Sequence, residues 1–439
     1  AIESIVLAGL ATNCDIEKHS MFYRKNYMYP DMAKNFQTTQ GPVAFCMRGH
    51  LDLAVDGPAV KERADLAGLA VGESRGNITK TEDGYVAHVG ITRIHMEEDA
   101  GKMVHIGGDE GRIAGATHSL VDYNRAGTPL IELVTEPELR TPEEARLFMQ
   151  KLRQIYLALG ISDCSMEEGS MRCDGNVSLR RRGATEFGTK TELKNMNSFK
   201  NLHDGLAYEI CRQAQVLEEG GFIRQETRHW DPSAKRTIVM RVKETADDYR
   251  LFPEPDLAPY DLTDEWIDAV RAKLPELPDQ KVARFQESFG LSAYDARTIV
   301  ENAALAALFE QTMACAGERA QALAKPVVNM LTNEAAAYMN AHAEFDIEQS
   351  PLTPQRLTSL VEAVAADEIS SKQGKEVLVA IIEEDKDPAA IIDERGMKQV
   401  SDTGALEAVV DAVIAENPGQ VEKYKSGNTK VIGFFVGQC

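Results

Sequence analysis

The stretch Val121-Asp-Tyr-Asn-Arg-Ala-Gly-Thr-Pro-Leu-Ile-Glu-Leu133 joins a polar turn to an apolar run, and an amphipathic segment follows it. The glycine and the proline mark the turn, and Leu130–Val134 predicts a buried strand. Thr141 and Glu144 then have the spacing of a capping box, and the apolar positions after them predict a helix over 142–159. A strand and a helix that each have an apolar face indicate a domain in which a helix packs on a sheet.

The composition and periodicity change along the chain. From about residue 20 to 260, short alternating stretches lie between clusters of Gly, Pro, Asn and Asp, which is typical of strands and turns. From about 263 onward the sequence is rich in Ala, Leu and Glu with helical spacing. We therefore expect strands and turns with a few helices in the first part of the chain, and nearly all-α structure after the proline-containing joint at 275–279.

A hairpin is predicted between 172–179 and 187–194, with a turn through 180–183. One face of this hairpin is polar on both arms. Such a face either meets water or lines a polar cavity, and the residues alone favour water. Its polar residues are Asp174, Asn176, Ser178, Lys190, Glu192 and Lys194.

The overall charge limits the possible partners. The 439 residues include 48 Lys and Arg against 69 Asp and Glu, so the net charge is −21, which excludes nucleic-acid binding through a general basic surface. No apolar run reaches the roughly 20 residues of a membrane span. Seven dispersed cysteines without a C-x-x-C pair indicate a reducing, cytoplasmic setting. The chain begins at Ala1 and ends inside an apolar tract, so we expect it to be part of a longer protein.

The segment from Gly90 to Lys102 is a candidate for phosphate chemistry. A strand-like run ends there in three consecutive carboxylates, Glu97, Glu98 and Asp99. Carboxylate oxygens are the ligands that Mg²⁺ prefers, and the lysine could hold a phosphate. A solvated acidic turn is the alternative.

Glu132 is a second candidate, because it interrupts an apolar run. A carboxylate in such a place is costly unless it is paired or binds a cation. Asp122, Asn124 and Arg125 lie in the turn before it. A salt bridge with Arg125 and the binding of a metal or substrate are both open explanations. A third acidic stretch, 247–257, predicts an extended surface segment.

Together these stretches resemble one family, the B subunit of the bacterial aspartyl/glutamyl-tRNA amidotransferase (GatB). The stretch 121–133 matches the family signature at every fixed position, and the resemblance covers nearly the whole chain. It implies an α+β cradle domain with a mixed or antiparallel sheet over 1–276, a helical domain over 277–367 and a small helical, YqeY-like tail over 368–439 that holds tRNA. The other matching motifs are Arg24–Asp31, His95–Lys102, Met166–Asp174, Gly188–Asn195 and Asp248–Leu257.

The resemblance implies a carbon–nitrogen ligase with glutamine as the nitrogen donor. In this family the B subunit binds misacylated Glu-tRNA(Gln) or Asp-tRNA(Asn) and uses ATP and Mg²⁺ to phosphorylate the side-chain carboxylate. Ammonia from a partner amidase (the A subunit) then displaces the phosphate, and the small C subunit completes the heterotrimer. The chemistry is sound, because a carboxylate is a poor acyl donor and an acyl phosphate is a good one.

The resemblance also assigns roles to residues. Glu98 and Glu132 match the metal-binding carboxylates, with Asp99 and Arg125 beside them as catalytic groups. Lys25 and Lys34 match polar positions near the ammonia route. The resemblance also places the polar face of the hairpin toward a cavity and not toward water. The residues expected to contact ATP and phosphate are Lys102, Asp122, Asn124, Asp174, Asn176, Lys190, Glu192 and Lys194.

Some features depart from the family pattern. The stretches 40–46 and 58–76 are unusual, and we expect no substrate contacts there. The family's opening strand, whose Glu and His complete the metal site, would precede Ala1, so this chain alone is expected to be a poor kinase. Two alternatives stay open: a non-catalytic scaffold that presents tRNA, and a Mg²⁺-dependent phosphohydrolase.

Overall fold

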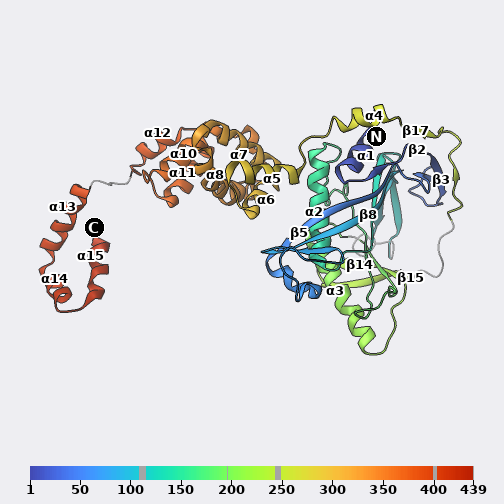
Figure 1. Ribbon diagram of the computed structural model, residues 1–439, viewed down its shortest axis with the longest axis horizontal. Coiled ribbons are helices and arrows are strands. Elements are labelled where there is room, and N and C mark those ends of the chain that lie inside the picture. The colour runs from blue at the N-terminus through green and yellow to red at the C-terminus, as the bar shows by residue number, and fades with distance from the viewer. Residues whose placement is uncertain (108–114, 195, 243–248, 399–402, 439) are drawn as a thin grey trace. The chain divides into compact units, whose positions relative to one another are not determined.

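The computed structural model describes residues 1–107, 115–194, 196–242, 249–398 and 403–438, so Asn195 and Asp248 of the motifs above lie outside the described residues. The chain divides into two compact units, Ala1–Leu277 and Pro278–Cys439. The first unit holds the sheets and the second is helical (Figure 1). The predicted α+β class is therefore confirmed. Within the described residues, no helix is both long and apolar enough to cross a membrane.

The main sheet of the first unit is organised around one long strand, β8 (Gly84–Glu98). β8 pairs in antiparallel fashion with β5 (Cys46–Asp56), β11 (Pro129–Thr135), β7 (Ile78–Lys80) and, at its end, β4 (Phe36–Gln40). The other strands of this sheet are β1 (Asp15–Ile16), β3 (Phe22–Asn26), β6 (Ser74–Arg75) and β16 (Phe252–Pro253).

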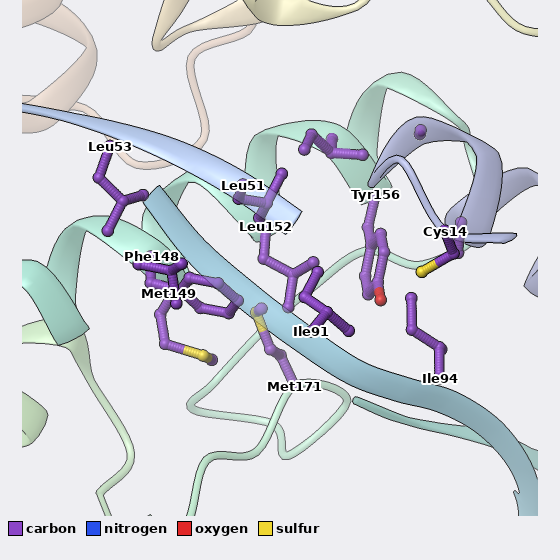
Figure 2. Close-up of a cluster of buried hydrophobic side chains, with 14 of the residues drawn as sticks. Cys14, Leu51, Leu53, Ile91, Ile94, Phe148, Met149, Leu152, Tyr156 and Met171 are labelled. Atoms are coloured by element: carbon purple, nitrogen blue, oxygen red, sulfur yellow. The ribbon is translucent and has the colours of Figure 1, made fainter. Parts of the chain in front are cut away.

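Helix α2 (Pro142–Ala158) covers this sheet and confirms the predicted helix. Figure 2 shows Phe148, Leu152 and Tyr156 of α2 beside Leu51 of β5 and Ile91 of β8. Helix α1 (Ile2–Ala11) packs against the same strands and α2. The alternating apolar residues of β5 and β8 thus form a core with the apolar faces of two helices.

The N-terminus of α2 differs from the predicted capping box in one bond. The Thr141 hydroxyl accepts a hydrogen bond from the backbone N–H of Glu144 at 3.1 Å, as expected. The Glu144 carboxylate, however, accepts from the backbone N–H of Arg140 (2.7 Å). Its other oxygen is held by Arg63 (2.5 Å) and by the Tyr85 hydroxyl (2.9 Å), and these buried partners fix where the carboxylate lies.

Two strand predictions need correction. β11 forms where 130–134 was predicted as a buried strand, but it is only half-buried, because among the described strands it pairs with β8 alone. The predicted hairpin is shorter than expected. β12 (Gly175–Val177) pairs with β13 (Thr191–Lys194) over three residue pairs, since the arginine-rich turn is exposed and has little apolar surface to bury.

A second sheet continues from this hairpin. β14 (Glu226–Asp231) adds parallel to β13, and β15 (Arg236–Val242) follows antiparallel. Helix α3 (Phe199–Glu218) packs against β12 and β15. The remaining elements of the first unit are β2 (His19–Ser20), β9 (Lys102–Ile106), β10 (His118–Asp122), β17 (Tyr260–Asp261) and α4 (Asp264–Arg271), with the 3-10 turns Gly57–Glu62 and Ala64–Leu66.

The acidic stretch 247–257 is not simply a surface segment. Phe252–Pro253 joins the main sheet as β16, beside β3. Glu254 is buried, and its two oxygens accept hydrogen bonds from Arg24 at 2.9 and 2.8 Å. The carboxylate is buried here because a guanidinium group from a distant strand pairs with it.

The second unit has a continuous apolar core from Phe285 to Ile392. Helices on both sides of the predicted boundary at 367/368 contribute to it, with Leu357 and Leu360 on one side and Val377 and Ile381 on the other. The domain boundaries remain predictions. The described α-helices are α5 (Pro278–Phe289), α6 (Ala293–Val300), α7 (Ala303–Ala316), α8 (Ala320–Asn329), α9 (Ala336–Ala341), α10 (Pro354–Ala365), α11 (Ser371–Glu384), α12 (Pro388–Glu394), α13 (Thr403–Glu416), α14 (Pro418–Lys425) and α15 (Ile432–Gln438), and the π-helix Met330–Ala335 links α8 to α9.

Candidate active site at the end of β8

The last residues of β8 bring three potential metal ligands together. His95 and Glu97 are two residues apart and therefore point to the same face of the strand. Glu132 of β11 lies directly opposite His95 in the ladder. One ligand atom from each of these three side chains lies within 4.8 Å of the others. His95 and Glu97 are buried, whereas the Glu132 side chain is 48% exposed, so the cluster opens toward solvent on one side.

Glu97 is held by a dense set of donors. Its oxygens accept hydrogen bonds from the Thr39 hydroxyl (2.9 Å) and from Gln37 Nε2 (3.0 Å), both on β4. His95 Nε2 lies 3.4 Å from Glu97 Oε1, and Lys25 Nζ lies 3.8 Å from the same oxygen. Burial raises the pKa of Glu97, but the hydrogen bond from His95 and the charge of Lys25 outweigh it, so the pKa lies below the usual glutamate value. Glu97 is therefore an anion at neutral pH.

Glu98 has different partners. Its carboxylate accepts a hydrogen bond from the backbone N–H of Thr38 at 2.8 Å and forms an ion pair with Lys34 at 2.7 Å. Glu98 lies opposite Pro129 in the ladder, three positions from the pair of His95 and Glu132. The predicted pair Glu98 and Glu132 thus belongs to one region, but the cluster of ligand atoms contains Glu97 in place of Glu98.

Asp99 and Arg125 were both predicted as site residues, and the structure brings them together. Arg125 Nε lies 3.2 Å from Asp99 Oδ2, and Arg172 Nη2 lies 2.9 Å from the same oxygen. Arg125 also donates to the carbonyls of Ala100 and Gly101. Two guanidinium groups therefore flank one carboxylate just after β8. Arg125 pairs with Asp99, and Glu132 lies beside His95 instead.

The residues predicted to contact ATP lie in two places. Lys102 and Asp122 face each other across the β9–β10 pair, and Asn124 follows in an exposed turn. The other five lie in β12 and β13 of the second sheet or directly before these strands. There Lys194 forms ion pairs with Asp174 (2.5 Å) and Glu192 (3.5 Å), and Asn176 and Lys190 are exposed.

Lys194 is charged despite its burial. Burial lowers the pKa of Lys194, and the hydrogen bond and charge of Asp174 raise it by more, so the pKa lies above the usual lysine value. Thr227 of β14 donates to Glu192 at 2.9 Å. The second sheet thus presents a fixed charged group. The role of its five predicted residues in binding ATP stays a prediction.

Sequence reasoning named Glu97 among three consecutive carboxylates but assigned no individual role to it, to His95 or to Arg172. His95 and Glu97 stand in the quoted motif, and their period-two spacing before a paired strand was the available signal. Arg172 lies in another quoted motif, but its contact with Asp99 depends on tertiary structure.

The donor set fits a divalent cation. Two carboxylates and one imidazole converge, and the half-exposed Glu132 leaves a way in from solvent. Lys25, Lys34, Arg125 and Arg172 provide positive charge around the same strand end. Such an arrangement can hold a cation and anionic phosphate oxygens close to each other.

Comparison with known proteins identifies the family. Residues 1–268 match the GatB/GatE catalytic domain, and residues 307–439 match the GatB domain. The chain is 46% identical over 437 residues to the B subunit of the aspartyl/glutamyl-tRNA(Asn/Gln) amidotransferase of Carboxydothermus hydrogenoformans, covering all of this chain and 83% of that protein. The proteins of the same name from Synechococcus elongatus and Geobacter sulfurreducens are both 44% identical, again over all of this chain and over 82% and 84% of their lengths.

The two family matches fall in both units of the chain, and the match over residues 1–268 includes the end of β8 and the candidate active site. The chain therefore belongs to the GatB family, the B subunits of a tRNA-dependent amidotransferase that is a glutamine-dependent carbon–nitrogen ligase.

Proposed function

We propose that this chain uses ATP and Mg²⁺ to phosphorylate the side-chain carboxylate of glutamate on tRNA(Gln) or aspartate on tRNA(Asn), the acceptors in the names of its relatives. The observation that carries this proposal is the cluster of Glu97, Glu132 and His95, with cationic side chains around it. Neither charge type alone would serve, because phosphoryl transfer needs both a cation site and contacts to phosphate oxygens.

The contacts favour a revised set of cation ligands. Glu132, Glu97 and His95 would hold Mg²⁺, and Glu98 stays close by in an ion pair with Lys34. Bound Mg²⁺ would supply positive charge that draws electron density from the phosphate oxygens. Thr39 and Gln37 fix the Glu97 carboxylate, so the chain orients this ligand before any cation binds.

The proposed reaction has two balanced steps. First, an oxygen of the side-chain carboxylate of the tRNA-bound glutamate or aspartate attacks the γ-phosphorus of ATP. The bond from that phosphorus to the β–γ bridging oxygen breaks, and ADP leaves. Then ammonia attacks the activated carbonyl carbon, the bond to the phosphate oxygen breaks, and an amide, phosphate and a proton are released. Arg125 and Arg172 beside Asp99 are placed to bind oxygens that gain negative charge in these steps.

The partners follow from the same proposal. Ammonia would come from a partner amidase (the A subunit), and the small C subunit would complete a heterotrimer. Lys25 and Lys34 pair with Glu97 and Glu98, which supports a polar, charged lining for an ammonia route at this point. We place the reaction in the cytoplasm, which agrees with the free thiols of the six cysteines in the described residues.

The decisive experiment is phosphate transfer from γ-labelled ATP with glutamine and ammonia left out. The assembled complex is given Glu-tRNA(Gln) or Asp-tRNA(Asn), and label on the aminoacyl group is measured for wild type, Glu97→Gln and Glu132→Gln. Label in wild type only would support the proposal. In a parallel reaction with glutamine added, amide formation by a wild type that carries no label in the first reaction would favour the tRNA-presenting scaffold. ATP hydrolysis without tRNA would favour the phosphohydrolase.

A further inference from the structure

A polar cavity lies on the first unit, away from the end of β8. Its volume is about 690 Å³, and its floor includes His50 of β5 and its cross-strand neighbour Gly90 of β8. The loop before α2 contributes Arg140, the loop after β12 contributes Arg180, and Arg63 forms part of the wall. We call this cavity the arginine hollow. It uses none of the residues placed in the candidate active site.

The charges in the arginine hollow are unequal. Arg63, Arg140 and Arg180 line it together with Asp65 and Glu138, in a chain whose net charge is −21. Arg63 is paired with Asp65 and with the buried Glu144, so Arg140 and Arg180 face Glu138 as the remaining carboxylate of the lining. Asp65 is bound to Arg63, and Glu138 accepts a hydrogen bond from the backbone N–H of Gly90 at 2.7 Å. Both carboxylates therefore already have partners.

Arg140 and Arg180 donate hydrogen bonds to backbone carbonyls. Arg140 Nη1 donates to the carbonyls of Pro137 (2.7 Å) and Leu139 (3.1 Å), and Arg180 Nη1 donates to the carbonyl of Thr185 (2.7 Å). In the part of the chain that the structure describes, no carboxylate forms an ion pair with either arginine. Arg140 and Arg180 line the same cavity. Burial and the charges of Arg180 and Arg63 lower the pKa of Arg140 by more than the charges of Glu144 and Glu138 raise it. An anion between Arg140 and Arg180 would offset the repulsion of their like charges.

We propose that the arginine hollow binds a backbone phosphodiester of the tRNA, a contact that rests on the proposed function and adds a docking point to it. The remaining N–H groups of two guanidiniums match the paired oxygens of a phosphate. The other residues that line the cavity are His, Asn, Gly, Asp and Glu, so it provides no apolar wall for a nucleotide base. A phosphate within a chain fits such a lining better than a free nucleotide does.

The test is tRNA binding by the assembled complex at several salt concentrations. Arg140→Gln with Arg180→Gln removes both charges. It should weaken tRNA affinity by roughly tenfold or more near 0.15 M salt and lower the slope of log K against log salt by about 1 to 2. Arg181→Gln with Arg182→Gln is the matched control, because these arginines are exposed in the same loop but do not line the cavity. Arg140→Lys with Arg180→Lys should restore most of the salt slope, which a folding defect would not allow.

Four results decide the matter. A double Gln variant that behaves like its control overturns the inference, and so does a wild type that does not bind tRNA. A loss of ATP affinity with unchanged tRNA affinity would assign the cavity to a free nucleotide phosphate and overturn the RNA assignment. If wild type transfers no label from ATP while the double Gln variant still loses tRNA, the proposed kinase function fails and the inference stands.

Discussion

Replacing Glu144 by Gln should destabilise the first unit strongly, although the side chain keeps its shape. Glu144 is fully buried, and its carboxylate accepts from Arg63, from Tyr85 and from the backbone N–H of Arg140. An amide has only one acceptor oxygen. In either orientation its NH₂ group therefore faces a donor, either Arg140 N–H or the pair of Arg63 and Tyr85.

The magnitude follows from these contacts. One buried donor without an acceptor costs about 1–3 kcal/mol, and loss of a charged hydrogen bond with Arg63 costs about 1.5–3 kcal/mol. Together they give roughly 2.5–6 kcal/mol, which includes the range of about 3–5 kcal/mol for breaking a buried ion pair. At about 2–4 °C per kcal/mol for a unit of this size, the midpoint of thermal unfolding should fall by roughly 5 °C or more.

Tryptophan fluorescence can follow this unit separately. The chain has two tryptophans, and both Trp230 and Trp266 belong to the first unit. Glu143→Gln is the matched control, since Glu143 is the neighbouring residue and forms a partly exposed pair with Arg146. That control should cost less than about 1 kcal/mol. Equal shifts for the two variants would refute the reasoning that the Glu144 network is a stabilising element.

Three further predictions test other parts of the molecule. Glu97→Gln and Glu132→Gln should each weaken the binding of Mn²⁺, used as a probe of the Mg²⁺ site, by roughly tenfold or more, whereas the Mn²⁺ affinity of Glu98→Gln should stay within about twofold of wild type. Equal losses of affinity in all three variants would contradict the assignment of Glu97 as a ligand in place of Glu98. The pKa of Glu209 is lowered, because burial raises it less than the hydrogen bonds from Arg212 and Gln213 lower it. The Glu209 carboxylate therefore stabilises the folded state fully above its unfolded pKa, near 4.5, and this stabilisation is lost as the pH falls through the folded pKa. In urea unfolding at pH 3–7, the free energy of unfolding should fall less steeply toward low pH in Glu209→Gln than in wild type. Arg172→Gln should slow labelled-phosphate transfer and shift the thermal midpoint by less than about 3 °C, whereas a large midpoint shift would make Arg172 a structural residue.

The sequence predicted the elements that local patterns specify. The helix over 142–159 was found because its cap, its apolar face and its stop lie within twenty residues, and α2 begins and ends within one residue of that range. For the candidate site, the sequence named the carboxylates near residue 98 and Glu132, but it could not say which of them lie together. Which side chains meet at the end of β8 depends on the register between residues 94–98 and 129–133, and no local pattern encodes that register.

Burial of charge was the hardest feature to predict. Glu132, inside an apolar run, is half-exposed, whereas Glu144, in a charged stretch, and Glu254, between two prolines, are buried. Their partners explain the difference, because Arg63 and Arg24 are 81 and 230 residues away along the chain. Sequence separation hides such pairs, and only the folded topology brings them together.

The length of β8 has a consequence for how this protein can vary. The strand carries Gly90 in the arginine hollow and Glu97 in the cation cluster, seven residues apart, or about 23 Å at the usual rise per residue. Loops can lengthen or shorten without changing that spacing, but the strand cannot. One residue inserted between 91 and 94 would move the two sites apart by one step and turn His95 and Glu97 to the opposite face. The length of β8 therefore sets the spacing between the arginine hollow and the cation cluster. Under the two proposals above, this spacing separates a bound backbone phosphate from the reacting end of the same tRNA.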